Sequence, residues 1–285
     1  MDNTRLEKAT QLAQDFLNFA NKGVSPYHVV HESTQRLQKA GFTQIHETEN
    51  WDLEKGGRYF FIRSESSLVA FIVGNEFDAN NTGFKVIGAH TDSPCLRLAP
   101  LSASSSHNFH QTCVCTYGGG LWHTWFDRDL ILAGRVVYKD DQDQLKTGLY
   151  NSESAILKVP NLAIHLTSID ERNKFAPNLE NHLKPILASQ IYEKLSGKTV
   201  ETINGPLGKS HYEGLLQHIQ KKVEFLLKKQ SIQIYVLQIV NKDKQLDQIK
   251  NLQVLLDQII YFLHGLLFWL QLILNIILEI LLMLI

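Results

Sequence analysis

The sequence predicts an α/β protein in its N-terminal three quarters and a tail of different character after it. Residues 1–214 alternate segments with helical and strand periodicity, and they hold all seven prolines and 16 of the 17 glycines. Residues 215–285 hold no proline and only Gly265, while leucine and isoleucine supply 31 of these 71 residues. We therefore expect the two parts to be different structures.

Two helices are predicted first. Apolar residues recur at helical spacing over residues 6–20, and Gly23 provides a stop. A second helix begins at Ser25 and Pro26, because serine caps helix starts and proline is tolerated in the first turn, and it ends at Gly41.

Three strands are predicted next, at residues 59–63, 67–73 and 84–89. The third run is short, apolar and ends in Gly-Ala, which is typical of a buried central strand. In open α/β sheets, ligands bind outside the carboxyl ends of such strands. The residues that follow this strand are His-Thr-Asp-Ser-Pro at 90–94.

His90 and Asp92 are therefore candidate site residues. If the extended geometry continues, both side chains point the same way. An imidazole is a good zinc ligand, and a neighbouring carboxylate fixes its tautomer. The alternative is a hydrogen-bonded turn in which Asp92 is a cap and Pro94 stops the strand.

Composition excludes several classes of protein. The formal net charge is −1, so there is no basic excess for binding nucleic acid. Three cysteines form no disulfide framework, which favours a reducing, cytoplasmic compartment. The N-terminal segment is charged and amphipathic, unlike a signal peptide.

Four blocks within residues 88–188 carry a family resemblance. They are GAHTDSPCLRLAP, TYGGGLWHTWFDRDLILAGRVV, KVPNLAIHL and NKFAPNLENHLKPILA, in this order. Together they resemble the aspartyl aminopeptidase family, zinc metallopeptidases that remove acidic residues from peptide N-termini. The resemblance covers roughly residues 5–225 and implies two zinc ions, a peptide substrate with an acidic N-terminal residue, and a homo-oligomer. It also implies a vacuole-like or lysosome-like compartment as the alternative to the cytoplasm.

The resemblance also implies a domain organisation. Residues 1–94 would be the N-terminal part of a zinc-aminopeptidase-like α/β catalytic domain. Residues 95–175 would be an inserted β-rich domain for dimerisation and oligomerisation, and residues 176–225 would return to the catalytic domain. Residues 226–285 would be a non-family, hydrophobic, helical tail.

Three site residues follow from the resemblance by position. His90 matches a zinc ligand and Asp92 the catalytic carboxylate that supports it. His165 matches a catalytic histidine that reaches from the inserted domain into a neighbouring subunit and stabilises the developing oxyanion. Without the family, His165 is the lone polar residue on a predicted strand at 162–166, which is more typical of a core histidine.

A second group of metal-binding residue types has an alternative interpretation. The spacing of His107, His110, Cys113 and Cys115 is compatible with zinc. However, residues 111–117 alternate like a strand, which favours a structural role.

The segment after residue 117 is expected to be structural. The glycines at 118–120 lack the lysine of a phosphate-binding loop and predict a tight turn that lets Trp122 and Trp125 pack. The Asp-Arg-Asp sequence at 127–129 predicts an ion-pair network at a domain or subunit interface.

Part of the expected metal machinery is not recognisable. Two-zinc chemistry needs a bridging carboxylate, further ligands and a glutamate base, yet the sequence has no Glu-Glu pair. The potential ligands after Glu224 are Asp243, Asp247, Asp257, His264 and Glu279. We expect this chain by itself to be inactive, with doubtful zinc binding. The alternatives are a non-catalytic relative that joins full-length subunits and a membrane-anchored derivative.

The tail allows several interpretations. Residues 258–278 carry no formal charge, and 21 helical residues span about 31 Å, enough for a bilayer. Gln258, His264, Gln271 and Asn275 interrupt this stretch, which argues against a membrane span. A shifted reading frame and a genuine oligomerisation helix are the other interpretations.

Overall fold

The computed structural model describes residues 3–78, 80–139, 142, 144–197, 210–227 and 231–241. The chain divides into two compact units, and each has its own sheet. The first unit contains residues 1–32 and 90–242, and the described part of the second contains residues 33–89.

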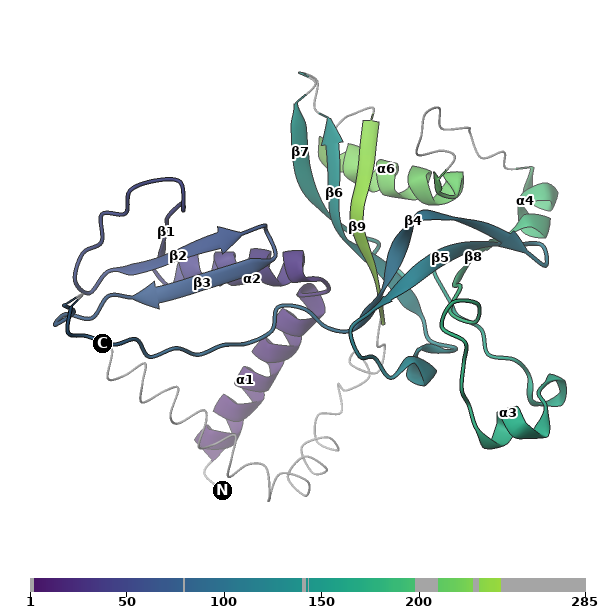
Figure 1. Cartoon of the computed structure of the whole chain (residues 1–285), viewed down its shortest axis with the longest axis horizontal. Helices are drawn as coiled ribbons and strands as arrows, with labels where there is room; N and C mark the ends of the chain where they lie inside the picture. The colour runs from purple at the N-terminus through teal and green to yellow at the C-terminus, as the bar shows by residue number, and fades with distance from the viewer. Residues whose placement is uncertain are drawn as a thin grey trace. The chain divides into compact units, whose positions relative to one another are not determined.

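The two predicted helices are confirmed as α1 (Asn3–Lys22) and α2 (Pro26–Lys39) (Figure 1). The amide of Gly23 donates to the carbonyl of Phe19 at 2.8 Å, which closes the last turn of α1. The second helix ends as predicted, because Gly41 adopts a φ of +81° that side-chain-bearing residues rarely adopt.

The second unit has a three-stranded sheet. β1 (Thr43–Gln44) pairs in parallel with β2 (Arg58–Arg63), and β2 pairs antiparallel with β3 (Ser67–Ile72). The strands predicted at 59–63 and 67–73 are therefore confirmed. Phe60 is fully buried, and Trp51 covers the ring of Phe61 with centroids 5.4 Å apart.

The third predicted strand is wrong in this structure. Residues 84–89 form no strand, and Phe84, Val86 and Ile87 are 84%, 85% and 69% exposed. The cause is the lack of a neighbour: no strand among the described residues pairs with this run. An apolar run without a hydrogen-bonded partner gains no burial from being extended.

The first unit has a six-stranded antiparallel sheet in the order β7-β6-β9-β4-β5-β8 (Figure 1). Its strands are β4 (Cys95–Ser106), β5 (Phe109–Tyr117), β6 (Leu130–Lys139), β7 (Leu145–Asn151), β8 (Ile186–Ser189) and β9 (Ser231–Asn241). The short helices between them are η1 (Trp122–Trp125), η2 (Ile164–Leu166), α3 (Ile169–Asn173) and α4 (Gln190–Ser196), and the longer α6 (Glu213–Leu227) precedes β9.

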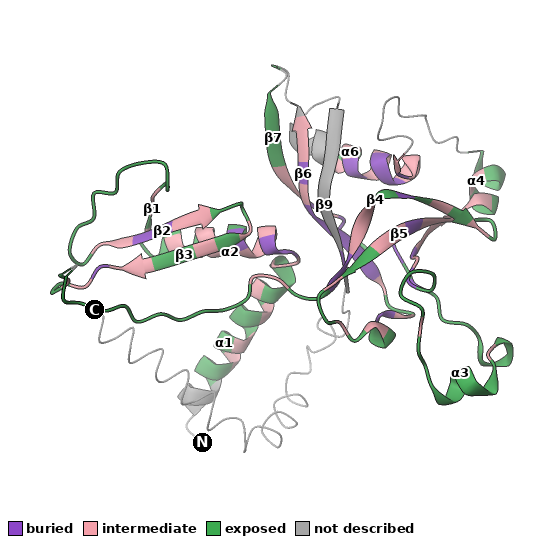
Figure 2. Ribbon diagram, viewed as in Figure 1, coloured by how far each residue is buried: buried purple, intermediate pink, exposed green. Residues whose placement is uncertain are grey.

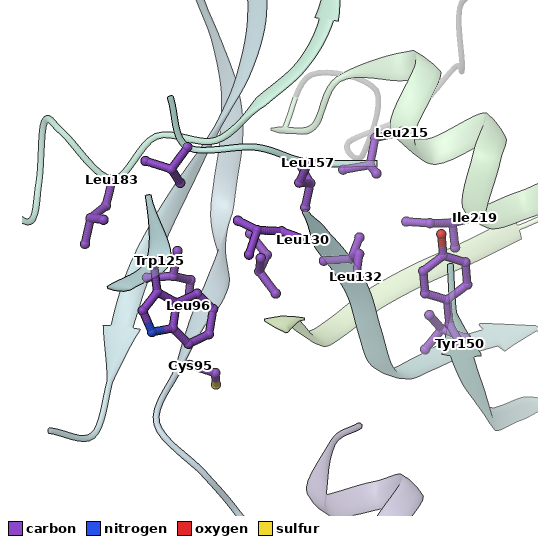
Figure 3. Close-up of a cluster of buried hydrophobic side chains, with 13 residues drawn as sticks. Cys95, Leu96, Trp125, Leu130, Leu132, Tyr150, Leu157, Leu183, Leu215 and Ile219 are labelled. Carbon is purple, nitrogen blue, oxygen red and sulfur yellow. The ribbon is translucent and has the colours of Figure 1, made fainter. Parts of the chain in front are cut away.

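The core of the first unit joins its sheet to α6. Leu130 and Leu132 of β6 are fully buried in one cluster with Leu215 and Ile219 of α6, as Figure 3 shows. Tyr150 of β7 completes this part of the cluster. Alternation along β6 and the helical spacing of residues 215 and 219 aim these side chains at one another.

One expectation about the later part of the chain needs correction. Residues 231–241, predicted to be helical tail, form β9, which pairs with β6 and with β4. Within residues 176–225, β8 pairs with β5, and α6 packs on apolar residues of the six-stranded sheet.

The rest of the tail, including residues 258–278, lies outside the described residues. In the part of the chain that the structure describes, no helix is long and apolar enough to cross a membrane.

Candidate metal-binding site

His90 and Asp92 lie in the segment that leads into β4. This segment is not a strand, but the two side chains still meet, with His90 Nδ1 3.0 Å from Asp92 Oδ1. The His90 side chain is 90% exposed and that of Asp92 is 33% exposed. The structure therefore brings together the pair that the sequence predicts, with the imidazole open to solvent.

The charge of Asp92 sets the tautomer of His90. The Tyr117 hydroxyl donates to Asp92 Oδ2 at 2.5 Å, and this bond, followed by the bond from His90, lowers the pKa of Asp92. The same contact raises the pKa of Tyr117. Because a carboxylate can only accept, His90 Nδ1 is the nitrogen that donates in this bond, and in the neutral imidazole Nε2 then keeps its lone pair.

A lone pair on an exposed imidazole nitrogen fits a first zinc ligand. The carboxylate on the other nitrogen is the usual second partner of such a histidine. Among the residues that the structure describes, no group of three or more histidine, cysteine, aspartate or glutamate side chains could hold a metal ion. The pair fits one corner of a metal site, and the remaining ligands are not in the described part.

The alternative zinc residues do not converge. His107 lies in the β4–β5 turn with a φ of +51°, and its Nδ1 is 2.6 Å from the Ser106 hydroxyl. His110 Nε2 is 2.9 Å from Glu193 Oε2, so a carboxylate already occupies that nitrogen. The strand predicted over residues 111–117 is confirmed as part of β5, which carries the two cysteines.

The glycine turn is structural, as predicted. Gly118 has a φ of +75°, which favours glycine, and it follows β5 directly. The rings of Trp122 and Trp125 lie with centroids 5.8 Å apart, and Trp125 is buried in the core cluster.

Asp127 and Arg128 bind the backbone. The Asp127 amide donates to the carbonyl of Val159 at 2.8 Å, and its carboxylate accepts from the amide of Asn161 at 2.9 Å. Arg128 Nε donates to the carbonyl of Thr124 at 2.9 Å. These bonds fix the chain that leads towards residue 165.

His165 lies on η2, so the strand predicted at 162–166 is wrong. The backbone there curls because no strand in the described residues pairs with it. The surrounding chain is exposed (Figure 2): Ile164 is 62%, Leu166 70% and Ile169 72% exposed. His165 is itself exposed, so the alternative of a core histidine is wrong. Among the described residues, no hydrogen bond or ion pair joins His165 to the His90–Asp92 pair.

Tyr117 is the site residue that sequence reasoning missed. The sequence pattern places it only in the strand before the glycine turn, yet it is the partner of Asp92. The available signal is strand register: the β4–β5 hairpin pairs Tyr117 with Cys95, three residues after Asp92.

The stretch of the chain that contains these residues is similar to known proteins. A model of the family described as aminopeptidase I zinc metalloprotease (M18) matches residues 19–248. The aspartyl aminopeptidase of Caenorhabditis elegans is 45% identical over 175 residues, which cover 61% of this chain and 36% of that protein.

Solved structures are also similar to this chain. The cryo-EM structure of the Ape4 and Nbr1 complex has a chain with a TM-score of 0.75 and 34% identity, and the match covers 83% of this chain and 45% of that one. The Saccharomyces cerevisiae mApe1 dodecamer matches with a TM-score of 0.63 and 26% identity, over 81% of this chain and 48% of that one. The chain spans 36% to 40% of the length of the first curated relatives that it matches.

Proposed function

The chain belongs to the aminopeptidase I zinc metalloprotease (M18) family, and from this we propose that it carries the N-terminal part of an aspartyl aminopeptidase. Such an enzyme hydrolyses the bond after an N-terminal aspartate or glutamate of a peptide. One observation carries the assignment: in the matched stretch, His90 Nδ1 is held by Asp92 at 3.0 Å while the imidazole is 90% exposed.

Within this proposal, His90 is a zinc ligand and Asp92 is the carboxylate that holds its tautomer. Zinc, when bound, would polarise the scissile carbonyl and activate a water molecule. The described residues of this chain supply one corner of the site, since no group of three ligand side chains occurs among them. The sequence has no Glu-Glu pair, and on this ground we propose that the 285 residues by themselves do not catalyse the reaction.

His165 would act in a second copy of the chain. Support comes from its surroundings: η2 and the residues beside it expose large apolar side chains, among them Leu162 at 55%, Ile164 at 62% and Leu166 at 70%. Exposed apolar side chains that gather on one segment, here residues 162–166, are typical of a contact surface. Placed against a neighbouring subunit, the imidazole would donate a hydrogen bond to the oxyanion that forms on the substrate carbonyl. The dodecameric relative agrees with a homo-oligomer.

The test joins the chain to the part of a relative that the match does not cover. The chain would be joined to the downstream half of the Caenorhabditis elegans relative and assayed for release of aspartate from an Asp-peptide with zinc present. His90→Ala should abolish activity, whereas His46→Ala, at an exposed position in the other unit, should retain it. Full activity in His90→Ala would show that the site assignment is wrong.

A second function follows from the same exposed segment at residues 162–166. A chain that keeps the subunit contact but lacks most ligands would join full-length subunits as a non-catalytic member. Co-expression with a full-length relative tests this: the two should co-purify, and Leu166→Asp should separate them. A chain that stays monomeric in the presence of the relative would contradict this function.

For the compartment, we propose the cytoplasm. The three free cysteines of the chain agree with this location.

A further inference from the structure

Tyr117 links the candidate ligand pair to the β-rich sheet. Its hydroxyl donates to Asp92 Oδ2 at 2.5 Å, while its backbone is paired with Cys95 across the β4–β5 hairpin. The segment from His90 to Pro94 lies outside any strand, so ladder hydrogen bonds do not fix it. The side chain of Tyr117 therefore ties a loop carboxylate to a regular element.

This contact restrains the orientation of the carboxylate. Asp92 Oδ1 is taken by His90 Nδ1 and Oδ2 by the Tyr117 hydroxyl, so rotation of the carboxylate would break both bonds. Without the phenol, either oxygen could face the imidazole, or water could replace it. Fixing the acceptor fixes both the ring orientation and the tautomer of His90.

Arg97 holds the tyrosine ring on its face. Two residues after Cys95 on β4, it places its guanidinium carbon 3.5 Å from the centroid of the Tyr117 ring. A cation over an aromatic face is attracted by the negative face of the ring. Arg97 is on a paired strand, and the ring is thus held by Arg97 on its face and by Asp92 at its hydroxyl.

We propose that Tyr117 is a positioning residue for metal binding. Its hydroxyl fixes Asp92, Asp92 fixes the Nδ1–H tautomer of His90, and His90 then presents Nε2 to zinc. Arg97 supports the ring. This inference rests on the proposed function for the identity of the metal, and it extends that function to a residue outside the His-Thr-Asp segment.

Two measurements on the 285-residue chain test the proposal without an activity assay. Long-range ¹H–¹⁵N correlation spectra report which imidazole nitrogen of His90 carries the proton. Titration with Zn²⁺, followed at the same nitrogens, reports affinity. In Tyr117→Phe, which keeps the ring and its contact with Arg97, we expect His90 to shift towards the Nε2–H tautomer and Zn²⁺ to bind about tenfold more weakly.

Tyr150→Phe is the matched control. It also removes a phenol from the β-rich unit, but the buried Tyr150 hydroxyl has no hydrogen-bond partner among the described residues, so both readouts should stay as in the wild type. Arg97→Lys, which keeps the charge but loses the planar guanidinium, should change both readouts in the same direction as Tyr117→Phe and by less. If Tyr117→Phe does not fold, the same two measurements on Arg97→Lys test the proposal.

A double-mutant cycle separates positioning from a merely structural role. If Tyr117 acts through Asp92, adding Tyr117→Phe to Asp92→Asn should cause no further loss of Zn²⁺ affinity. Additive losses, or a folded Tyr117→Phe chain with unchanged tautomer and affinity, would overturn the inference. His90→Ala decides the proposed function separately: undiminished Zn²⁺ binding in that variant overturns the metal assignment itself.

Discussion

Strand β6 and residues 84–89 are both short apolar runs that contain a glycine, and the structure treats them differently. In β6, Leu130 and Leu132 are fully buried and ladder bonds run to β7 on one side and β9 on the other. In the other run, Val86 is 85% exposed and no strand lies beside it in the described residues.

The difference shows that strand formation depends on the partner as much as on the run itself. Residues that are β-branched or aromatic favour strands because they pack on a pleated surface beside neighbours. β6 finds such neighbours within the chain, including β9 from a segment whose composition did not predict a strand. Residues 84–89 carry an equally good strand sequence, but the described chain gives them no surface to join.

The largest expected effect tests this contrast in the core. Leu132→Ala removes a fully buried side chain that lies opposite the fully buried Ile239, so it should lower the free energy of unfolding by about 3 kcal/mol. Ile87→Ala removes a side chain that is 69% exposed and should change it by less than about 0.5 kcal/mol. Urea unfolding followed by tryptophan fluorescence, to which Trp125 of the same core contributes, measures both.

Equal losses in the two variants would break the comparison. They would show that residues 84–89 are buried in solution, by another part of the chain or by a second copy. Analytical ultracentrifugation of the wild type would then distinguish these two causes.

A smaller effect is expected from His28, which is half-buried in the first unit. Burial lowers its pKa from 6.5 to about 4, and the neighbouring His31 adds to the decrease. Between these pH values the unfolded chain binds a proton that the folded chain does not, so stability falls as pH drops from 7 towards 4. We expect a loss on the order of 2 kcal/mol from this group over that range.

His28→Gln isolates the contribution of His28 to the pH dependence of stability. Glutamine at the same place in the first turn of α2 can still hydrogen-bond to the cap residue Ser25, but it does not titrate. Its unfolding free energy should fall less between pH 7 and pH 4. Some dependence should remain, since burial also lowers the pKa of His211 and of His218. An unchanged pH slope would contradict the assignment to His28.

Local signals in the sequence predicted the two helices and the β2–β3 hairpin well. Helical spacing, the Ser25-Pro26 start and the stops at Gly23 and Gly41 mark α1 and α2, because capping and glycine conformation are properties of a few adjacent residues. The boundaries of β2 and β3 followed in the same way from the residue types of one hairpin.

Features that depend on distant partners were not predictable. The strand β9 forms because β6 and β4 offer it a place, although its own composition resembles the apolar tail. In the same way, the predicted strand around His165 had no partner and became the exposed η2. At the site, the His90–Asp92 pair was readable from spacing, but Tyr117 was not, because it is brought there by hairpin register 25 residues along the chain.

The smallest expected effect concerns two glycines, one in the turn after β5 and one in the exposed run of residues 84–89. Gly118, after β5, has a φ of +75°, and a Cβ there would lie 3.4 Å from the Pro94 side chain. Gly118→Ala should therefore lower the free energy of unfolding by about 1 kcal/mol, since alanine is strained in the left-handed region. Gly88, in the exposed run, has no positive φ, and a methyl group added there would meet no described atom within 4 Å, so Gly88→Ala should have nearly no effect or stabilise slightly.

Urea unfolding of the two variants beside the wild type measures this difference. Because Gly118 adjoins Tyr117, strain at the turn should also disturb the Tyr117–Asp92 bond, and the His90 imidazole signals should shift in Gly118→Ala but not in Gly88→Ala. A destabilised Gly118→Ala chain with unchanged His90 signals would mean that the turn strain is absorbed before it reaches the site. Equal stability of the two variants would instead mean that residues 84–89 are as constrained in solution as the glycine turn.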